Sequence, residues 1–302
     1  MGVRVRPMRE DDEDAVLELI AEISRESAVV AGRIAAMVGT FGLLRLVAEA
    51  DGVIVGRAAL ARTPMMPPGT IAAGVGVRAS SRRTGVGGAL WDQLVADLPA
   101  GTDRLLGFSD DRDDAEVLPW VTARGLAPFQ HSLRVTLDLR ALPPLDPLPA
   151  DVTIEMLDPG TTRDDPEVAA LYAESDTSPE AEAIGPISWP DELDALASPG
   201  SALLCLVHVR GRPVAMTLAQ ESDQQRWDVM YTGVHPDSRG HGLAMVAKQH
   251  LHQSLVGRGA THVASDNEAE NAGMRRVNEK LGYVWTRGTR RFARDLTANP
   301  LP

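Results

Sequence analysis

Residues 231–244, YTGVHPDSRGHGLA, decide how the C-terminal half of this chain is interpreted. The stretch leaves an apolar strand, turns at Gly240 and Gly242, and enters a helix with apolar residues every four positions from Leu243 to Leu255. Glycines let a ligand approach the backbone closely, and the first turn of a helix offers unpaired N–H groups at the positive end of its dipole. The stretch therefore predicts an anion-binding loop, with Arg239 as a charge-assisted donor to phosphate. A tight turn that binds nothing is the alternative.

The N-terminal half contains a second loop of the same kind. There the strand TIAAGVGV, residues 70–77, leads into ASSRRTGVGG and another amphipathic helix. Each half also has a hairpin before its loop, with turn signals at Asp51-Gly52 and at Gly211, and each ends in a strand, a helix and a strand. One order of elements thus occurs twice, which indicates a duplicated domain.

A proline-rich segment separates the two halves. The prolines of ALPPLDPLPAD, residues 141–151, cannot donate to a sheet ladder and favour an extended linker. We expect an N-terminal domain over residues 1–140, a linker over 141–151 and a C-terminal domain over 152–302. The predicted fold class is α/β (α+β), with two tandem domains that each have a mixed, mostly antiparallel sheet flanked by helices.

The composition argues against several classes of protein. The formal net charge of −12 at pH 7 disfavours nucleic-acid binding, which needs a basic face. No apolar run approaches the roughly 20 residues that span a bilayer, and the polar N-terminus lacks a secretory pattern. Cys205 is the only cysteine, and its apolar surroundings predict a buried structural residue. We therefore expect a cytoplasmic protein with no nucleic-acid or membrane partner, and the histidine spacing predicts no metal site.

The two loops carry a family resemblance. Arg239, Gly242 and Ala244, and likewise Arg82, Gly85 and Gly87, have the spacing of the signature loop of the GNAT superfamily of N-acetyltransferases, which this sequence resembles. SDNEAENAGMRRVNEKLGY, residues 265–283, is similar to the last helix of that family. The resemblance covers most of residues 152–297 and, more loosely, residues 3–137. The tandem layout is similar to that of mycothiol synthase-like acetyltransferases of actinobacteria.

The resemblance implies acetyl-CoA as co-substrate. In the C-terminal half, the strand over 226–235 would separate from its neighbour to admit the thioester arm, and the Val234 region would offer an N–H group to the thioester oxygen. Asn271 would contact the pantetheine arm. The backbone N–H groups that would hold the pyrophosphate belong to Arg239, Gly240, His241, Gly242, Leu243 and Ala244. The matching residues of the N-terminal half are Val77, Arg82, Gly85 and Gly87.

The resemblance also suggests catalytic residues. An acid often stands on this strand in the family, and here the matching residue is Asp228, a candidate base for the amine; a structural or surface carboxylate is the alternative. The N-terminal match is Ile71, so that half is expected to be a partly degenerate, non-catalytic copy. The family's acidic tyrosine is replaced by Asn278 and Val121. Tyr231 is a possible substitute or a core residue, and the strand-end histidines, His208 and His235, are weaker candidate bases.

These features predict an N-acetyltransferase that moves an acetyl group from acetyl-CoA to a primary amine of a small molecule by direct attack. The alternative is a non-catalytic acyl-CoA-binding or sensing module. The acceptor would lie against variable segments around residues 160–200, where the sequence shows no recognisable chemistry. The acceptor, the acyl-chain preference, the general acid, acetyl-CoA binding by the N-terminal domain and the oligomeric state are left open.

Overall fold

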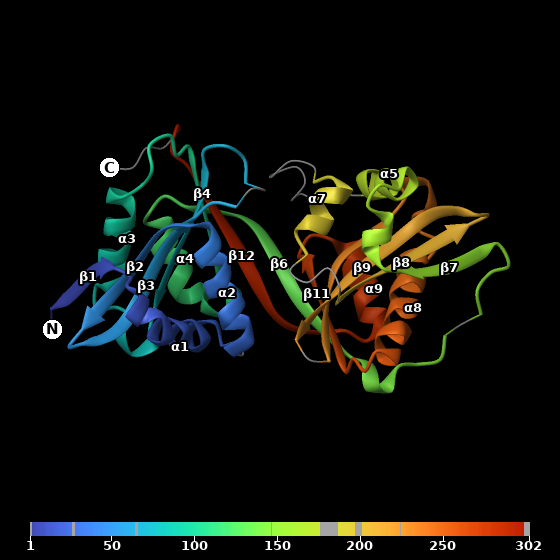
Figure 1. Ribbon diagram of the computed structural model, residues 1–302, viewed down its shortest axis with the longest axis horizontal. Helices are drawn as coiled ribbons and strands as arrows, with labels where there is room; N and C mark the ends of the chain where they lie inside the picture. The colour runs from blue at the N-terminus through green and yellow to red at the C-terminus, as the bar shows by residue number, and fades with distance from the viewer. Residues whose placement is uncertain are drawn as a thin grey trace. The chain divides into compact units, whose positions relative to one another are not determined.

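The computed structural model describes residues 2–25, 28–63, 66–145, 147–175, 187–196, 201–223 and 225–298, and the chain forms two compact units (Figure 1). Unit 1 consists of Met1–Gln130 with Thr289–Pro302, and unit 2 consists of His131–Gly288. Among the described residues, no helix is long and apolar enough to cross a membrane.

Unit 1 is a sheet with helices on both faces. Its strands lie in the order β1-β2-β3-β4-β5-β12, and β12 belongs to this unit from Thr289 onward. The elements in chain order are β1 (Val3–Pro7), α1 (Glu13–Ser24), α2 (Ala28–Phe41), β2 (Gly42–Ala50), β3 (Val53–Ala61), β4 (Thr70–Val77), α3 (Val86–Ala96), β5 (Arg104–Asp110), α4 (Asp114–Thr122) and, from the far end of the chain, β12 (Val284–Asp295).

Alternation along β2 explains the two layers of helices in unit 1. Successive side chains of a strand point to opposite faces of the sheet. Leu46 and Ala48 accordingly join the core that includes Leu90 of α3, while Val47 joins the core beneath α1. Because both faces of the central strands are covered, these strands read as continuous apolar runs.

Unit 2 repeats this architecture with the strand order β6-β11-β10-β9-β8-β7. On β8, Leu203, Cys205 and Val207 pack toward α8, while Ala202, Leu204 and Leu206 pack toward α5 and α7. The elements are β6 (Ala127–Asp138), β7 (Val152–Leu157), α5 (Pro166–Ser175), α7 (Trp189–Asp194), β8 (Ala202–Val209), β9 (Arg212–Asp223), β10 (Arg226–Val234), α8 (Leu243–Gly257), β11 (His262–Glu268) and α9 (Ala272–Leu281).

The predicted fold class is confirmed. Most strand pairs in each unit are antiparallel, and parallel pairs join β4 to β5 and β10 to β11. The hairpin turns also lie where the sequence places them, at Asp51-Gly52 (φ 50° and 78°) and Arg210-Gly211 (φ 53° and 77°). Cys205 is fully buried, as its apolar surroundings predict, and burial raises the pKa of its thiol to about 12. Helix α2 was not predicted.

The last strands of the two sequence halves are exchanged between the units. Strand β6 pairs with β11, from Ser132 opposite Glu268 to Asp138 opposite His262. Strand β12 pairs with β5, from Thr289 to Asp295. The compact units therefore differ from the predicted ranges 1–140 and 152–302, because each half contributes its final strand to the other half's sheet.

Candidate functional site

In unit 2, β10 separates from β11 halfway along its length. The parallel ladder between them runs from Arg226 opposite His262 to Val229 opposite Ser265 and then ends. A bulge at Met230 follows, and β10 continues to pair with β9 as far as Val234. The N-terminal part of β10 is thus paired on both edges, and its C-terminal part is paired with β9 alone.

The orientation of the backbone at the end of β10 follows from one hydrogen bond. His235 donates its N–H to Val214 O on β9 at 2.9 Å. Because N–H groups of an extended chain alternate between its two edges, the N–H of Val234 faces the edge that β11 has left. A carbonyl oxygen placed along this edge would find a preformed donor.

The loop between β10 and α8 has two left-handed residues, Gly240 (φ 82°) and Gly242 (φ 77°), and Gly242 is the N-cap of α8. Within the described part of the chain, no backbone N–H of residues 240–244 donates to another backbone group, whereas Met245 and Val246 donate to Gly242 O. These free N–H groups at the start of a helix suit an anion.

Arg239 differs from its predicted role. Its backbone N–H donates to Pro236 O at 3.2 Å and so is not free for a phosphate. Its guanidinium donates to Val234 O at 3.1 Å and to Ser175 O, the last carbonyl of α5, at 3.3 Å. Arg239 therefore ties the loop to the end of β10 and to α5. Its backbone N–H, which the resemblance places at a pyrophosphate, is engaged within the loop, and the N–H groups without a backbone acceptor among the described residues begin at Gly240.

Asp228 lies on β10 just before the ladder with β11 ends, and it has a cationic partner. Arg134 of β6 donates through Nη2 to Asp228 Oδ1 and through Nη1 to Asp266 Oδ2, the latter at 2.5 Å. Arg134 and Asp266 are opposite each other in the β6–β11 ladder, and the two carboxylates raise the pKa of Arg134 against the lowering effect of burial. Asp228 thus belongs to an ion-pair network across three strands, and among the described residues its Oδ2 has no hydrogen-bond partner.

Tyr231 joins β10 to α5. Its hydroxyl forms a 2.8 Å hydrogen bond with Ser175 Oγ, and its ring lies 4.6 Å from the ring of Tyr172, centroid to centroid. Tyr231 also packs against the core between α5, α7 and the sheet. These contacts fit the core interpretation of Tyr231 rather than a proton donor to a leaving group.

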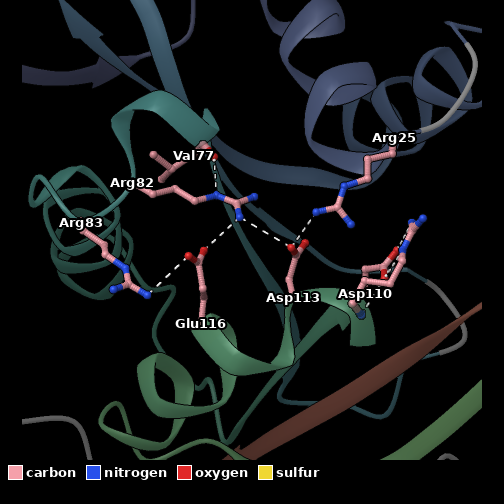
Figure 2. Close-up of polar contacts among 8 residues, drawn as sticks. Arg25, Val77, Arg82, Arg83, Asp110, Asp113 and Glu116 are labelled. Carbon is pink, nitrogen blue, oxygen red and sulfur yellow. Dashed lines mark hydrogen bonds and ion pairs between the residues drawn. The ribbon is translucent and has the colours of Figure 1, made fainter.

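Unit 1 has the same backbone arrangement with different surroundings. The β4–β5 ladder ends at Ala72 opposite Leu106, while β4 stays paired with β3 to Val77. The following loop has left-handed residues Arg83 (φ 62°) and Gly85 (φ 93°). Figure 2 shows that carboxylates of the α4 segment, Asp113 and Glu116, lie against the arginines of this loop.

Residues 167–283, which contain the separated strand and the loop of unit 2, match the acetyltransferase (GNAT) family model. The chain contains a GNAT domain. It is 27% identical over 260 residues to a mycothiol acetyltransferase of Actinosynnema mirum, covering 81% of this chain and 82% of that protein. The acetyltransferase family and this relative support an acyltransferase.

Solved structures extend the similarity to the whole fold. A GCN5-related N-acetyltransferase of Sphaerobacter thermophilus superposes with a TM-score of 0.73 at 18% identity, covering 97% of this chain and 96% of that one. A tandem GNAT protein from the clavulanic acid biosynthesis pathway gives a TM-score of 0.68 at 18% identity, covering 97% and 98%. The fold is therefore a tandem GNAT fold, with unit 2 containing the sequence-matched domain.

Asn271 and Asn278 lie on the last helix of the GNAT domain. Asn271 is the N-cap of α9, and its Oδ1 accepts from the Met274 backbone N–H at 3.0 Å. Asn278, which stands where the resemblance expects a tyrosine, is 2% exposed and accepts a 2.6 Å hydrogen bond from Lys248 Nζ. Neither asparagine can supply a proton to a thiolate.

The two strand-end histidines each have an acidic partner. His235 Nε2 lies 2.8 Å from Glu174 Oε2, and its Nδ1 accepts from the Asp237 N–H. His208 Nε2 lies 3.2 Å from Glu155 Oε2. Within the described ranges, no three His, Cys, Asp or Glu residues are grouped closely enough to hold a metal ion.

The partners of the predicted residues do not follow from the sequence pattern. Arg134 belongs to a strand that the pattern assigns to the other half, and Asp113 and Glu116 read as ordinary acids near a helix start. Lys248 is the clearest missed signal, because an isolated lysine stands among the apolar positions of α8. Much of the predicted acceptor region, residues 176–186 and 197–200, lies outside the described residues.

Proposed function

We propose that this chain is an acetyl-CoA-dependent N-acetyltransferase whose unit 2 transfers an acetyl group to a primary amine of a small molecule. The observation that carries the proposal is that two sets of backbone N–H donors follow each other closely in the GNAT domain. The open edge of β10 ends at Val234, and the free N–H groups of residues 240–244 begin six residues later, at the start of α8.

This arrangement suits the two ends of acetyl-CoA. The diphosphate would accept hydrogen bonds from the N–H groups of residues 240–244, at the positive end of the α8 dipole. The pantetheine amides would pair with the open edge of β10, as an added strand would. The thioester oxygen would then accept from the Val234 N–H, a contact that strengthens as negative charge develops on this oxygen.

In the proposed reaction, the amine nitrogen attacks the thioester carbon. An N–C bond forms, the C–S bond breaks, the amine loses a proton and the CoA thiolate leaves and takes up a proton. We assign the first proton to Asp228, directly or through one water, because it is the carboxylate of β10 beside the point where β11 departs. Arg134 holds Oδ1, and Oδ2 would accept the proton from the amine or from a bridging water.

A second candidate is a non-catalytic acyl-CoA-binding module. Asn278 favours it, because this residue occupies the position of the missing acid and its Oδ1 accepts a hydrogen bond from Lys248. The same donor set would bind the ligand in either case, so only turnover separates the two candidates.

The experiment is a CoA-release assay on the purified chain with acetyl-CoA and a panel of amino sugars, polyamines and amino acids. We expect amine-dependent release of CoA and an acetylated amine of matching mass. Gly242→Glu, which places a carboxylate in the loop, should abolish the reaction. Binding of acetyl-CoA without turnover of any amine would favour the binding module, and the absence of binding would refute both.

A further inference from the structure

The loops of the two units have one backbone geometry. Arg83 (φ 62°) and Gly85 (φ 93°) in unit 1 correspond to Gly240 (φ 82°) and Gly242 (φ 77°) in unit 2. In both units the first arginine donates through Nε to the last residue of the preceding strand, Arg82 to Val77 O at 3.3 Å and Arg239 to Val234 O at 3.1 Å. The loop of unit 1 has therefore kept the shape of an anion site.

The charges around the two loops differ. In unit 1, Arg82 Nη1 donates to Glu116 at 3.0 Å and lies 3.6 Å from Asp113. Arg83 lies 3.4 Å from the other oxygen of Glu116, and Arg25 donates to Asp113 at 2.8 Å. Figure 2 shows Glu116 between the two loop arginines, where an anion on the loop would need them.

Among the described residues of unit 2, the arginine of the loop has no carboxylate partner. The second contact of the Arg239 guanidinium is the neutral carbonyl of Ser175, and within the described residues no carboxylate lies within 4.0 Å of Arg239. Helix α9 of unit 2, which corresponds to α4 of unit 1, has Asn271 at its N-cap, whereas α4 has Asp113 there. Within the described ranges, carboxylates thus contact the first loop arginine in unit 1 and not in unit 2.

Burial shows which of these contacts is most firmly held. The side chains of Asp113 and Arg82 are 15% and 27% exposed, whereas Arg83 is 79% exposed. Exposed ion pairs contribute little, so the Arg83 contact alone would yield to a ligand. An incoming diphosphate would also have to separate Arg82 from both carboxylates and lie beside their negative charge, which disfavours binding.

We propose that the carboxylates of Asp113 and Glu116 take the place of a bound diphosphate at the loop of unit 1 and so prevent acetyl-CoA from binding there. The chain would then bind one acetyl-CoA, in unit 2. The proposal rests on the proposed function for the identity of the ligand. It predicts a latent diphosphate site in unit 1 that opens when the two carboxylates are neutralised.

The test is calorimetric titration of full-length chains with acetyl-CoA, with unit 2 blocked by Gly242→Glu. We compare Gly242→Glu alone, the same chain with Asp113→Asn and Glu116→Gln, and the same chain with Glu10→Gln and Asp11→Asn. The last pair removes equal charge from exposed positions of unit 1, in the short turn that precedes α1. Ala244→Glu, at a helical position, replaces Gly242→Glu if the latter does not fold.

We expect one acetyl-CoA site in the unmodified chain and none in Gly242→Glu. One new site should appear when Asp113→Asn and Glu116→Gln are added to Gly242→Glu, and none when Glu10→Gln and Asp11→Asn are added instead. The new site should be at least tenfold tighter than any binding left in Gly242→Glu. A site that survives Gly242→Glu, or no gain in the neutralised chain, would overturn the proposal. If the unmodified chain binds nothing, the donor assignment of the proposed function fails, while the neutralised chain still decides whether the carboxylates close unit 1.

Discussion

Lys248 Nζ donates a 2.6 Å hydrogen bond to Asn278 Oδ1 in the interior of unit 2, where neither side chain is more than 2% exposed. The ammonium group also lies 4.8 Å from the centre of the Tyr283 ring, and the Tyr283 hydroxyl bonds to His252 Nε2 at 2.8 Å. Burial lowers the pKa of Lys248 to about 7. Burial, and to a lesser degree the Lys248 charge, lower the pKa of His252 to about 3.

Lys248 should make the stability of unit 2 depend on pH above neutrality. The pKa of an unfolded lysine is about 10.4, so between about pH 7 and pH 10 the unfolded chain binds more protons and the free energy of unfolding rises with pH. The upper limit is about 1.4 kcal/mol per pH unit. Lys248→Met should remove this slope, measured by urea unfolding between about pH 7 and 9.

The other lysine of the chain, Lys280, is exposed, and Lys280→Met is the control that should keep the slope. The window ends below about pH 10 because burial also raises the pKa of the Tyr283 phenol, so that stability falls again once the unfolded phenol ionises. The protonation of His252 acts in a separate window, with stability lost as the pH falls below about 6.5. An unchanged slope in Lys248→Met would show that Lys248 is not the titrating group.

Asp228→Asn tests the assignment of the base. The network of Arg134 offers a matched control, because Asp266 binds the same guanidinium but is 52% exposed and belongs to β11. If Asp228 accepts the amine proton, Asp228→Asn should lower kcat by about 10²–10⁴-fold, whereas Asp266→Asn should change it by less than about tenfold. Steady-state rates with a responsive amine decide the question. Equal losses in the two variants would mean that Asp228 only helps to hold Arg134.

Local features of this fold follow from the sequence because their causes lie within a few residues. The Asp51-Gly52 turn, the glycine loop after β10 and the four-residue spacing on α8 each depend on backbone freedom or on one buried face. The exchange of β6 and β12 does not follow, because an alternating strand pattern shows which face is buried but not which neighbour pairs with its edge.

The site was predictable to the same extent. The loop between β10 and α8 could be predicted because its shape depends on two of its own residues, the left-handed Gly240 and Gly242. The Arg134–Asp228 pair joins residues 94 positions apart, and the Arg82–Glu116 pair joins residues 34 apart. Such pairs are set by strand order and helix placement, so a motif predicts the residue but not the partner that changes its chemistry.

Gly233→Ala should destabilise the junction between β10 and α5. A Cβ at Gly233 would lie 2.2 Å from Ser175 Oγ and 2.6 Å from the Tyr231 hydroxyl, so both side chains would have to move. Overpacking of this kind costs about 1–3 kcal/mol, and the free energy of unfolding from urea titration measures it. Gly74→Ala, in strand β4 of unit 1, is the control, because a Cβ there meets nothing within 4 Å. Similar effects of the two substitutions would contradict the close packing at Gly233.

Phe292→Ala tests the strand exchange, because this residue near the end of the chain should stabilise unit 1. Phe292 is 1% exposed, belongs to the core of unit 1 and stands opposite Gly107 of β5. Truncation of a buried phenylalanine costs about 3–5 kcal/mol. Hydrogen exchange should therefore show faster opening of the amides of β3, β4 and β5, with those of β8 and β9 unchanged. Phe108→Ala, at the 65% exposed neighbour on β5, should leave both sets of amides protected. Faster hydrogen exchange confined to β8 and β9 would mean that Phe292 stabilises unit 2 instead, and would refute the strand exchange.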